Sequence, residues 1–199
     1  MTRITYRPTE LMSEQARALT VERGDLNVYR ALANAVNVFT GWMQAGRAAL
    51  TSTVLPTRLR ELVILRVGHL MECPYEIIQH TGIASAAGLG AAEIAALTSD
   101  SHSGEGDFST VESAVIELTT QLVTTNRATA KAVEAVHRAL GAEATMEVLM
   151  VINRWSGLAL MLNALEVDID ETARIAIPDA RQPEAGPTDM RNAMPPSTC

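Results

Sequence analysis

Residues 57–89 read TRLRELVILRVGHLMECPYEIIQHTGIASAAGL and hold the strongest secondary-structure signals in the chain. In the first half, apolar side chains recur at spacings of three and four residues, which favours a largely buried helix from Thr57 to about Met71. Pro74 suits the first position of a second helix, because its missing N–H costs nothing there. We expect that helix to stop at Gly88. This segment therefore predicts two consecutive helices.

Helical spacing continues on both sides of this segment, and strand signals are nearly absent, with only 4% aromatic residues. Ser109 and Glu112 form a capping box that opens one helix, and Gly141 closes another. We expect an all-α fold, a helical bundle. Its further helices are predicted over Thr9 to Val21, Asn27 to Phe39, Trp42 to Leu50, Ala91 to Leu97, Ser109 to Thr125, Thr129 to Leu140 and Glu143 to Val167.

The domain organisation follows from length and composition. A chain of 199 residues suits one domain, which we assign to residues 1–177. Five of the eight prolines lie between Pro178 and Pro196, where apolar periodicity is absent. Such a composition buries too little apolar surface to order itself. Residues 178–199 are therefore predicted to be a disordered tail or an arm laid on a neighbouring subunit.

The overall composition excludes several classes of protein. A net charge of −7 does not neutralise phosphates, so we expect no nucleic-acid partner. No run approaches the roughly 18 apolar residues of a membrane span, and the N-terminus lacks a secretory pattern. Cys73 and Cys199 lie far apart, which suits a reducing compartment. We expect a cytoplasmic protein that does not bind membranes.

The remaining histidines do not suggest a metal site. His69 lies near a helix end, His102 lies in a polar loop, and His137 follows Glu134 as an ordinary surface pair. Scattered histidines and one cysteine lack the ligand spacing of zinc proteins. We expect neither a metal nor a cofactor.

The residues with most chemical potential are Glu61, Cys73, Glu76 and His80. The last three share one helix face, and Cys73 lies at the helix start, where the dipole lowers a thiol pKa. A carboxylate one turn from an imidazole is a workable proton-transfer pair. The alternative is structural, with the cysteine as a small core residue and Glu76 as a partner of the helix dipole. Spacing alone leaves both interpretations open.

The runs RLRELVILRV at 58–67 and CPYEIIQH at 73–80, followed by AGL at 87–89, resemble the carboxymuconolactone decarboxylase and alkylhydroperoxidase D family. NVYRALA at 27–33 and LNAL at 162–165 are similar to its flanking segments. The resemblance covers roughly residues 27–169. It implies an all-helical subunit of the alkylhydroperoxidase D type that assembles as a trimer or a hexamer.

The resemblance separates two activities. The peroxidase branch has a Glu, then Cys-x-x-Cys and a later His, and Glu61, Cys73 and His80 fall on those positions. Glu76 replaces the second cysteine, which a recyclable disulfide requires. The decarboxylase branch is more similar, because Tyr75-Glu76 followed by His80 matches its pattern. We therefore expect a cofactor-independent decarboxylase, or a related proton-transfer lyase, acting on a small carboxylated acid or lactone.

In that interpretation Glu76 and His80 transfer the proton and Glu61 orients the imidazole. Arg58, Arg60 or Arg66 receives a substrate carboxylate, with ordinary ion pairs as the alternative for at least one of them. Tyr75 and Trp155 are expected to contact substrate. The segment Asn153-Arg154-Trp155-Ser156 departs from the family's Tyr-Tyr-Asn pattern, which leaves the substrate open.

Two alternative functions remain. One is a peroxidase that uses Cys73 alone, and the other is a non-catalytic oligomeric binding protein. Apolar residues of the last helix are numerous enough to predict a homo-oligomer, a trimer or hexamer by resemblance. They are Met146, Leu149, Met150, Leu158, Leu160, Met161 and Leu162.

Overall fold

A computed structural model of the chain describes residues 2–100, 107–171 and 175. All regular elements in those residues are helical, which confirms the predicted all-α fold. In chain order they are the short 3-10 helix η1 (Thr9–Leu11) and the α-helices α1 (Glu14–Glu22), α2 (Asn27–Leu32), α3 (Phe39–Thr51), α4 (Thr57–Leu70), α5 (Pro74–Ala86), α6 (Ala91–Leu97), α7 (Thr110–Thr125) and α8 (Ala130–Leu165). The predicted tail 178–199, His102 and Cys199 lie outside the described residues.

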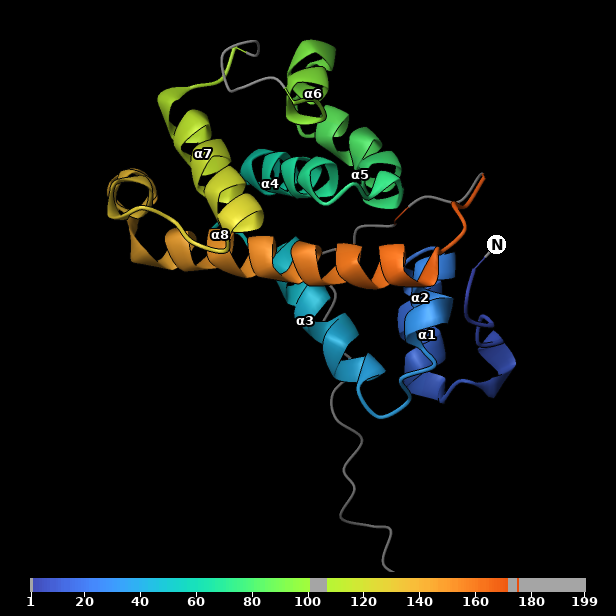
Figure 1. Cartoon of the computed structure of the whole chain (residues 1–199). Helices are drawn as coiled ribbons and strands as arrows, with labels where there is room; N and C mark the ends of the chain where they lie inside the picture. Colours follow the sequence, from blue (N-terminus) through green and yellow to red (C-terminus); the bar gives the residue numbers. More distant parts are fainter. Residues whose placement is uncertain (1, 101–106, 172–174, 176–199) are drawn as a thin grey trace, which may run out of the picture.

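The long helix α8 divides the molecule (Figure 1). Helices α4 to α7 lie on one side of it, and α1 to α3 lie on the other. Helix α4 packs against α5, α6, α7 and α8, and its residues from Leu59 to Gly68 are all buried. The dense apolar pattern of this segment therefore corresponds to a helix enclosed on all sides.

Several predicted helix ends are confirmed. Pro74 is the first residue of α5, and Gly88 follows its end with a φ of 92°. Ser109 accepts a hydrogen bond from the Glu112 amide and opens α7 as a capping box. Gly141, with φ 78° and ψ 175°, interrupts α8 at the predicted boundary, so the helix consists of two segments across a kink.

The predicted helix from Thr9 to Val21 is wrong in its first turn. The chain forms η1 and then starts α1 after Ser13, whose Oγ accepts a hydrogen bond from the Ala16 amide. A side chain that satisfies an unpaired amide in this way favours a new helix start.

The predicted helix from Asn27 to Phe39 is also wrong, because α2 ends at Leu32. Turns separate it from α3, and Asn34 donates side-chain hydrogen bonds there to the carbonyls of Thr5 and Ala31. Asparagine offers the backbone such alternatives to a continuing helix.

Helix α8 is long and apolar enough to cross a membrane by length and composition. This is weak evidence for a span, since the core helix of a globular protein meets the same criteria. Buried residues of α8, among them Val148, Val151 and Trp155, belong to the hydrophobic core around α4.

The apolar residues proposed for an oligomer contact differ in burial, and Leu149 and Met161 are partly buried against the core. Leu158 and Leu162 are buried within the subunit itself. Met146, Met150 and Leu160 are exposed, at 56%, 64% and 60% of their surface. These three lie four and then ten residues apart, which places them along one side of the helix. The homo-oligomer stays a prediction, with this narrower stripe as the surface to test.

Candidate functional site

His80 lies between two carboxylates in the interior of the protein. Its Nδ1 is 2.7 Å from Oε2 of Glu61, and its Nε2 is 3.5 Å from Oε2 of Glu76. All three side chains are at most 2% exposed. The structure therefore brings together three of the four residues predicted to form the chemical cluster.

The turn between α4 and α5 creates this arrangement. Glu72 adopts a left-handed conformation with φ 50°, and the Cys73 amide donates a hydrogen bond to the Gly68 carbonyl at 2.8 Å. Gly68 also lets the two helices approach closely, because a Cβ there would lie 3.1 Å from Ile77 Cγ1. Helix α5 consequently packs along α4, and His80 meets Glu61 across 19 residues of sequence.

Glu61 and, from α8, Trp155 together fix which imidazole nitrogen carries the proton. The Nε1 of Trp155 donates a hydrogen bond to His80 Nε2 at 3.3 Å, and the two rings meet edge to face. A nitrogen that accepts a hydrogen bond is unprotonated, so Nδ1 holds the proton and donates it to Glu61. Nε2 accepts the Trp155 N–H, and Oε2 of Glu76 lies 3.5 Å from the same nitrogen.

Burial and neighbouring charges shift the pKa values of Glu76 and His80. Burial raises the pKa of Glu76, although the charges of His80 and Arg154 and the Trp155 N–H act in the opposite direction. Burial alone would lower the pKa of His80, but the carboxylates of Glu61 and Glu76 outweigh it and leave this pKa raised. The charge of each group therefore affects the protonation of the other.

Glu76 Oε2 has no hydrogen-bond partner within the described residues, although it is buried. Buried polar atoms in folded proteins are nearly always satisfied, so an unsatisfied carboxylate oxygen marks a position where a ligand or a proton is accommodated. It belongs to the wall of a small cavity.

The cavity has a volume of about 30 Å³, enough for one or two water molecules. A small organic ligand needs more room, so binding requires the lining side chains to separate. The lining comes from α2, α3, α5, α8 and the end of α1: Arg23, Val28, Tyr29, Leu32, Trp42, Met43, Gly46, Leu50, Glu76, His80, Arg154, Trp155, Leu158 and Ile175.

Cys73 does not line this cavity. It precedes Pro74 as predicted, but it is 1% exposed and packs in the core with residues such as Tyr29 and Phe39. Burial raises the thiol pKa to about 11, and the nearby amides of Glu76 and Tyr75 do not compensate. The expectation of a lowered thiol pKa was therefore wrong, because desolvation outweighs the helix dipole.

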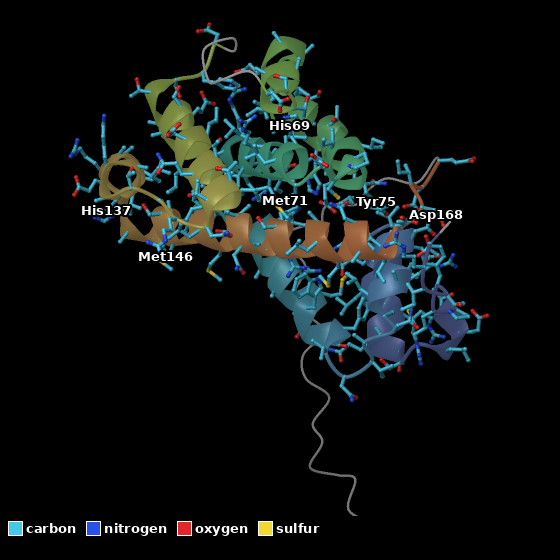
Figure 2. The ribbon with its side chains drawn as sticks, viewed as in Figure 1. His69, Met71, Tyr75, His137, Met146 and Asp168 are labelled. Atoms are coloured by element: carbon cyan, nitrogen blue, oxygen red, sulfur yellow. The ribbon has the colours of Figure 1, made fainter. Side chains whose placement is uncertain are left out.

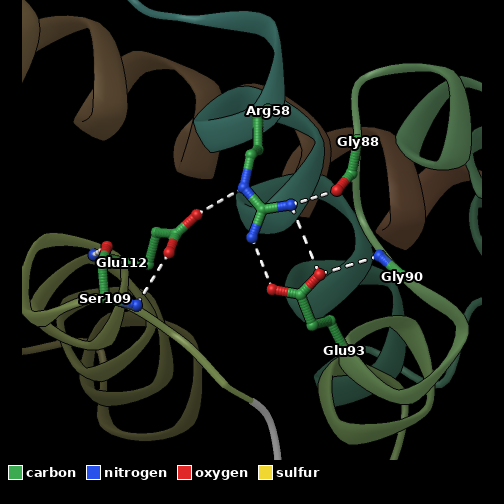
Figure 3. Close-up of polar contacts among 6 residues, drawn as sticks. All are labelled: Arg58, Gly88, Gly90, Glu93, Ser109 and Glu112. Atoms are coloured by element: carbon green, nitrogen blue, oxygen red, sulfur yellow. Dashed lines mark hydrogen bonds and ion pairs between the residues drawn. The ribbon is translucent and has the colours of Figure 1, made fainter.

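Arg58 lies away from the cavity, in an ion-pair cluster (Figure 3). Its guanidinium donates to Glu112 at 2.6 Å, to Glu93 at 2.5 Å and to the Gly88 carbonyl at 2.5 Å. Glu93 and Glu112 also accept hydrogen bonds from the Gly90 and Ser109 amides, at 2.8 Å each. The arginine therefore joins α4 to the starts of α6 and α7.

Arg66 and Arg60 are likewise outside the cavity lining. Arg66 donates to Thr120 at 3.1 Å and to the Ser99 carbonyl at 2.8 Å. The Arg60 Nε lies 3.6 Å from Glu61 Oε1, so Arg60 is a neighbour of the site through that carboxylate. The structure brings none of the three predicted arginines to the cavity.

The Tyr75 hydroxyl forms hydrogen bonds to other parts of the protein. It donates to Asp170 at 2.5 Å and accepts from the Val28 amide at 3.3 Å. Figure 2 shows Tyr75 near Asp168, at the opposite end of the molecule from His137 and Met146. Tyr75 does not line the cavity, whereas Trp155 does.

The other described histidines are remote from the cluster. His69 pairs with Asp100, with 2.9 Å between Nε2 and Oδ1, and His137 is exposed. The described residues contain no group of three or more His, Cys, Asp or Glu side chains arranged for a metal ion.

Sequence reasoning did not assign Arg23, Tyr29, Trp42 or Arg154 to the site, although all four line the cavity. Arg154 had a usable signal, since it is a charged residue inside an apolar helix and lies beside Trp155. Arg23 had none, because nothing in the spacing connects the end of α1 with α5 or α8.

Comparisons with known proteins agree with this architecture. Residues 37–107 match the model of the carboxymuconolactone decarboxylase family. The chain is similar to the crystal structure of an alkylhydroperoxidase AhpD core, an uncharacterized peroxidase-related protein from Ralstonia eutropha JMP134. The TM-score is 0.76 at 13% identity, over 85% of this chain and 93% of that chain, a likeness that shows the fold. No curated protein matches. Residues 37–107 are therefore similar to the carboxymuconolactone decarboxylase family, and the fold is that of the alkylhydroperoxidase AhpD core.

Proposed function

We propose that the protein is a cofactor-independent decarboxylase, or a closely related proton-transfer lyase, acting on a small organic acid or lactone. The observation that carries the proposal is the buried Glu61–His80–Glu76 unit, whose Glu76 Oε2 is unsatisfied at a cavity wall. A raised carboxyl pKa beside a fixed imidazole is what general acid–base catalysis requires near neutral pH.

The reaction places simple demands on these groups. When the bond to the departing carboxylate breaks, its electron pair passes into the conjugated carbonyl and CO2 leaves. The resulting enolate needs a proton on carbon. The Glu76–His80 pair supplies that proton and recovers it from solvent, while Glu61 keeps the imidazole oriented.

Cys73 argues against the peroxidase alternative. A thiol that reduces peroxides needs an accessible thiolate, whereas this one is 1% exposed with a pKa raised to about 11. Glu76 occupies the place where a resolving thiol would be required.

The test is an assay of purified protein against a panel of carboxylated lactones and unsaturated small acids in D2O. CO2 release together with one deuterium incorporated at carbon would support the proposal. Deuterium exchange without CO2 release would support the lyase form. Sustained reduction of organic hydroperoxides with a dithiol, and no reaction on the panel, would overturn it.

A further inference from the structure

Two positively charged side chains face the same cavity as Glu76 and His80. Arg23 caps the end of α1 and is 3% exposed, and Arg154 projects from α8. Burial lowers the pKa of Arg23. Burial and the positive charge of Arg23 together lower the pKa of Arg154 to about 10. Arginine side chains stay protonated in proteins, so both guanidiniums carry a positive charge.

Neither guanidinium forms an ion pair with a carboxylate within the part of the chain that the structure describes. Arg23 interacts with the Tyr29 hydroxyl, which carries no charge because burial raises its pKa to about 12. The Nε of Arg23 has no hydrogen-bond partner among those residues. Two like charges close together at a partly enclosed site, with no carboxylate in ion-pair contact, are costly, and a bound carboxylate would reduce that cost.

Other residues hold Arg154 in place. Its guanidinium carbon lies 4.4 Å from the ring centroid of Trp42 in a cation–π contact. Gly46 of α3 leaves the space for it, since a Cβ at that position would overlap the guanidinium. A glycine inside a helix costs about 1 kcal/mol relative to alanine, so this one is explained by the room it gives Arg154.

We propose that Arg23 and Arg154 form the recognition site for a substrate carboxylate, so that the ligand of this cavity is a small organic carboxylate. Guanidinium groups bind carboxylates through paired N–H donors, which orients the ligand as well as holding it. The anion then sits opposite Glu76 and His80, with its reacting carbon between the two sets of groups. The position of the reacting carbon rests on the proposed function, whereas carboxylate binding by the two arginines does not depend on it.

Tryptophan fluorescence can detect a ligand in the cavity, because both tryptophans of the chain, Trp42 and Trp155, line it. We would titrate the protein with sodium maleate, dimethyl maleate and inorganic phosphate, following tryptophan fluorescence and calorimetric heat. Maleate should bind saturably and its uncharged ester should not. Phosphate binding more tightly than maleate would overturn the assignment to carboxylates.

The decisive variants are Arg154→Met and Arg154→Lys, with Arg17→Met as the matched control, since Arg17 is exposed on α1. Arg154→Met should weaken maleate binding at least tenfold, the lysine variant should restore part of it, and the control should match the parent. Unchanged affinity in Arg154→Met, or no maleate binding by the parent, would overturn the inference. Gly46→Ala, which displaces Arg154 without removing its charge, should also weaken binding, measured at a temperature where circular dichroism shows it folded.

These experiments distinguish failure of carboxylate recognition by the arginines from failure of the proposed lyase activity. Maleate binding that depends on Arg154, without turnover on any acid, supports this inference and overturns the lyase. Turnover whose KM is unchanged in Arg154→Met supports the lyase and overturns this inference.

Discussion

The Nδ1 atom of His80 lies 2.7 Å from Oε2 of Glu61, and both side chains are almost completely shielded from solvent. The carboxylate therefore fixes the imidazole tautomer and contributes to its raised pKa. Glu61→Gln should lower the His80 pKa, because it removes a negative charge, and reduce turnover. The His80 resonances in NMR titrations of the variant would measure this. Glu134→Gln, an exposed site on α8, is the control, and an unshifted His80 titration would contradict the assigned role.

His80→Ala and Glu76→Gln should each reduce turnover by roughly 10²–10⁴, the usual cost of losing a general acid or base. Initial rates on any substrate found would measure the effect, with helicity and oligomer size as controls for folding. Activity that persists unchanged in His80→Ala would defeat the mechanism.

Cys73→Ala should have a milder effect on turnover, because the thiol is buried outside the cavity. The parent should show no catalytic turnover of organic hydroperoxides with a dithiol reductant, which a coupled reductase assay would measure. Stoichiometric oxidation of the thiol is compatible with this expectation. Sustained peroxide turnover that vanishes in Cys73→Ser would refute it.

Arg58→Met should lower the free energy of unfolding by about 1–3 kcal/mol at pH 7 while leaving ligand binding unchanged. Arg58 and backbone amides keep the pKa of Glu93 low, and they outweigh burial to lower that of Glu112. Lowered carboxyl pKa values stabilise the fold above about pH 4.3, and that contribution disappears as the pH falls through the native values.

Urea unfolding of Arg58→Met and of the Arg17→Met control from pH 7 to pH 3 would measure this. The difference between the two should shrink on acidification. If the difference in unfolding free energy between the two variants stayed constant across that pH range, the ion pairs of Arg58 would not be the cause of the destabilisation.

The exposed stripe on α8 should be a subunit contact. Light scattering should give a parent mass that is a multiple of 21.4 kDa, and Met150→Glu should reduce it. Leu11→Glu, at an equally exposed site on η1, is the control. A parent mass near one subunit at micromolar concentration would rule out the oligomer.

Local sequence signals were sufficient for most of the fold. The apolar spacing of residues 57–71, Pro74 at a helix start and the Ser109 capping box act within one or two turns, so they can be recognised without tertiary information. The two errors at residues 9–13 and 33–39 arose where Ser13 and Asn34 bond to backbone groups and interrupt the helix.

For the site, sequence by itself determined that Glu76 and His80 share a helix face, because one turn of helix sets that geometry. Only the tertiary structure decided which charges face them. Arg58 and Arg66 are paired elsewhere, whereas Arg23 and Arg154 come to the cavity from helices more than 100 residues apart. The tertiary structure also decided the thiol pKa of Cys73. Its position at a helix start predicted a lowered thiol pKa, but the side chains packed over it desolvate the sulfur, and desolvation is a property of the whole fold.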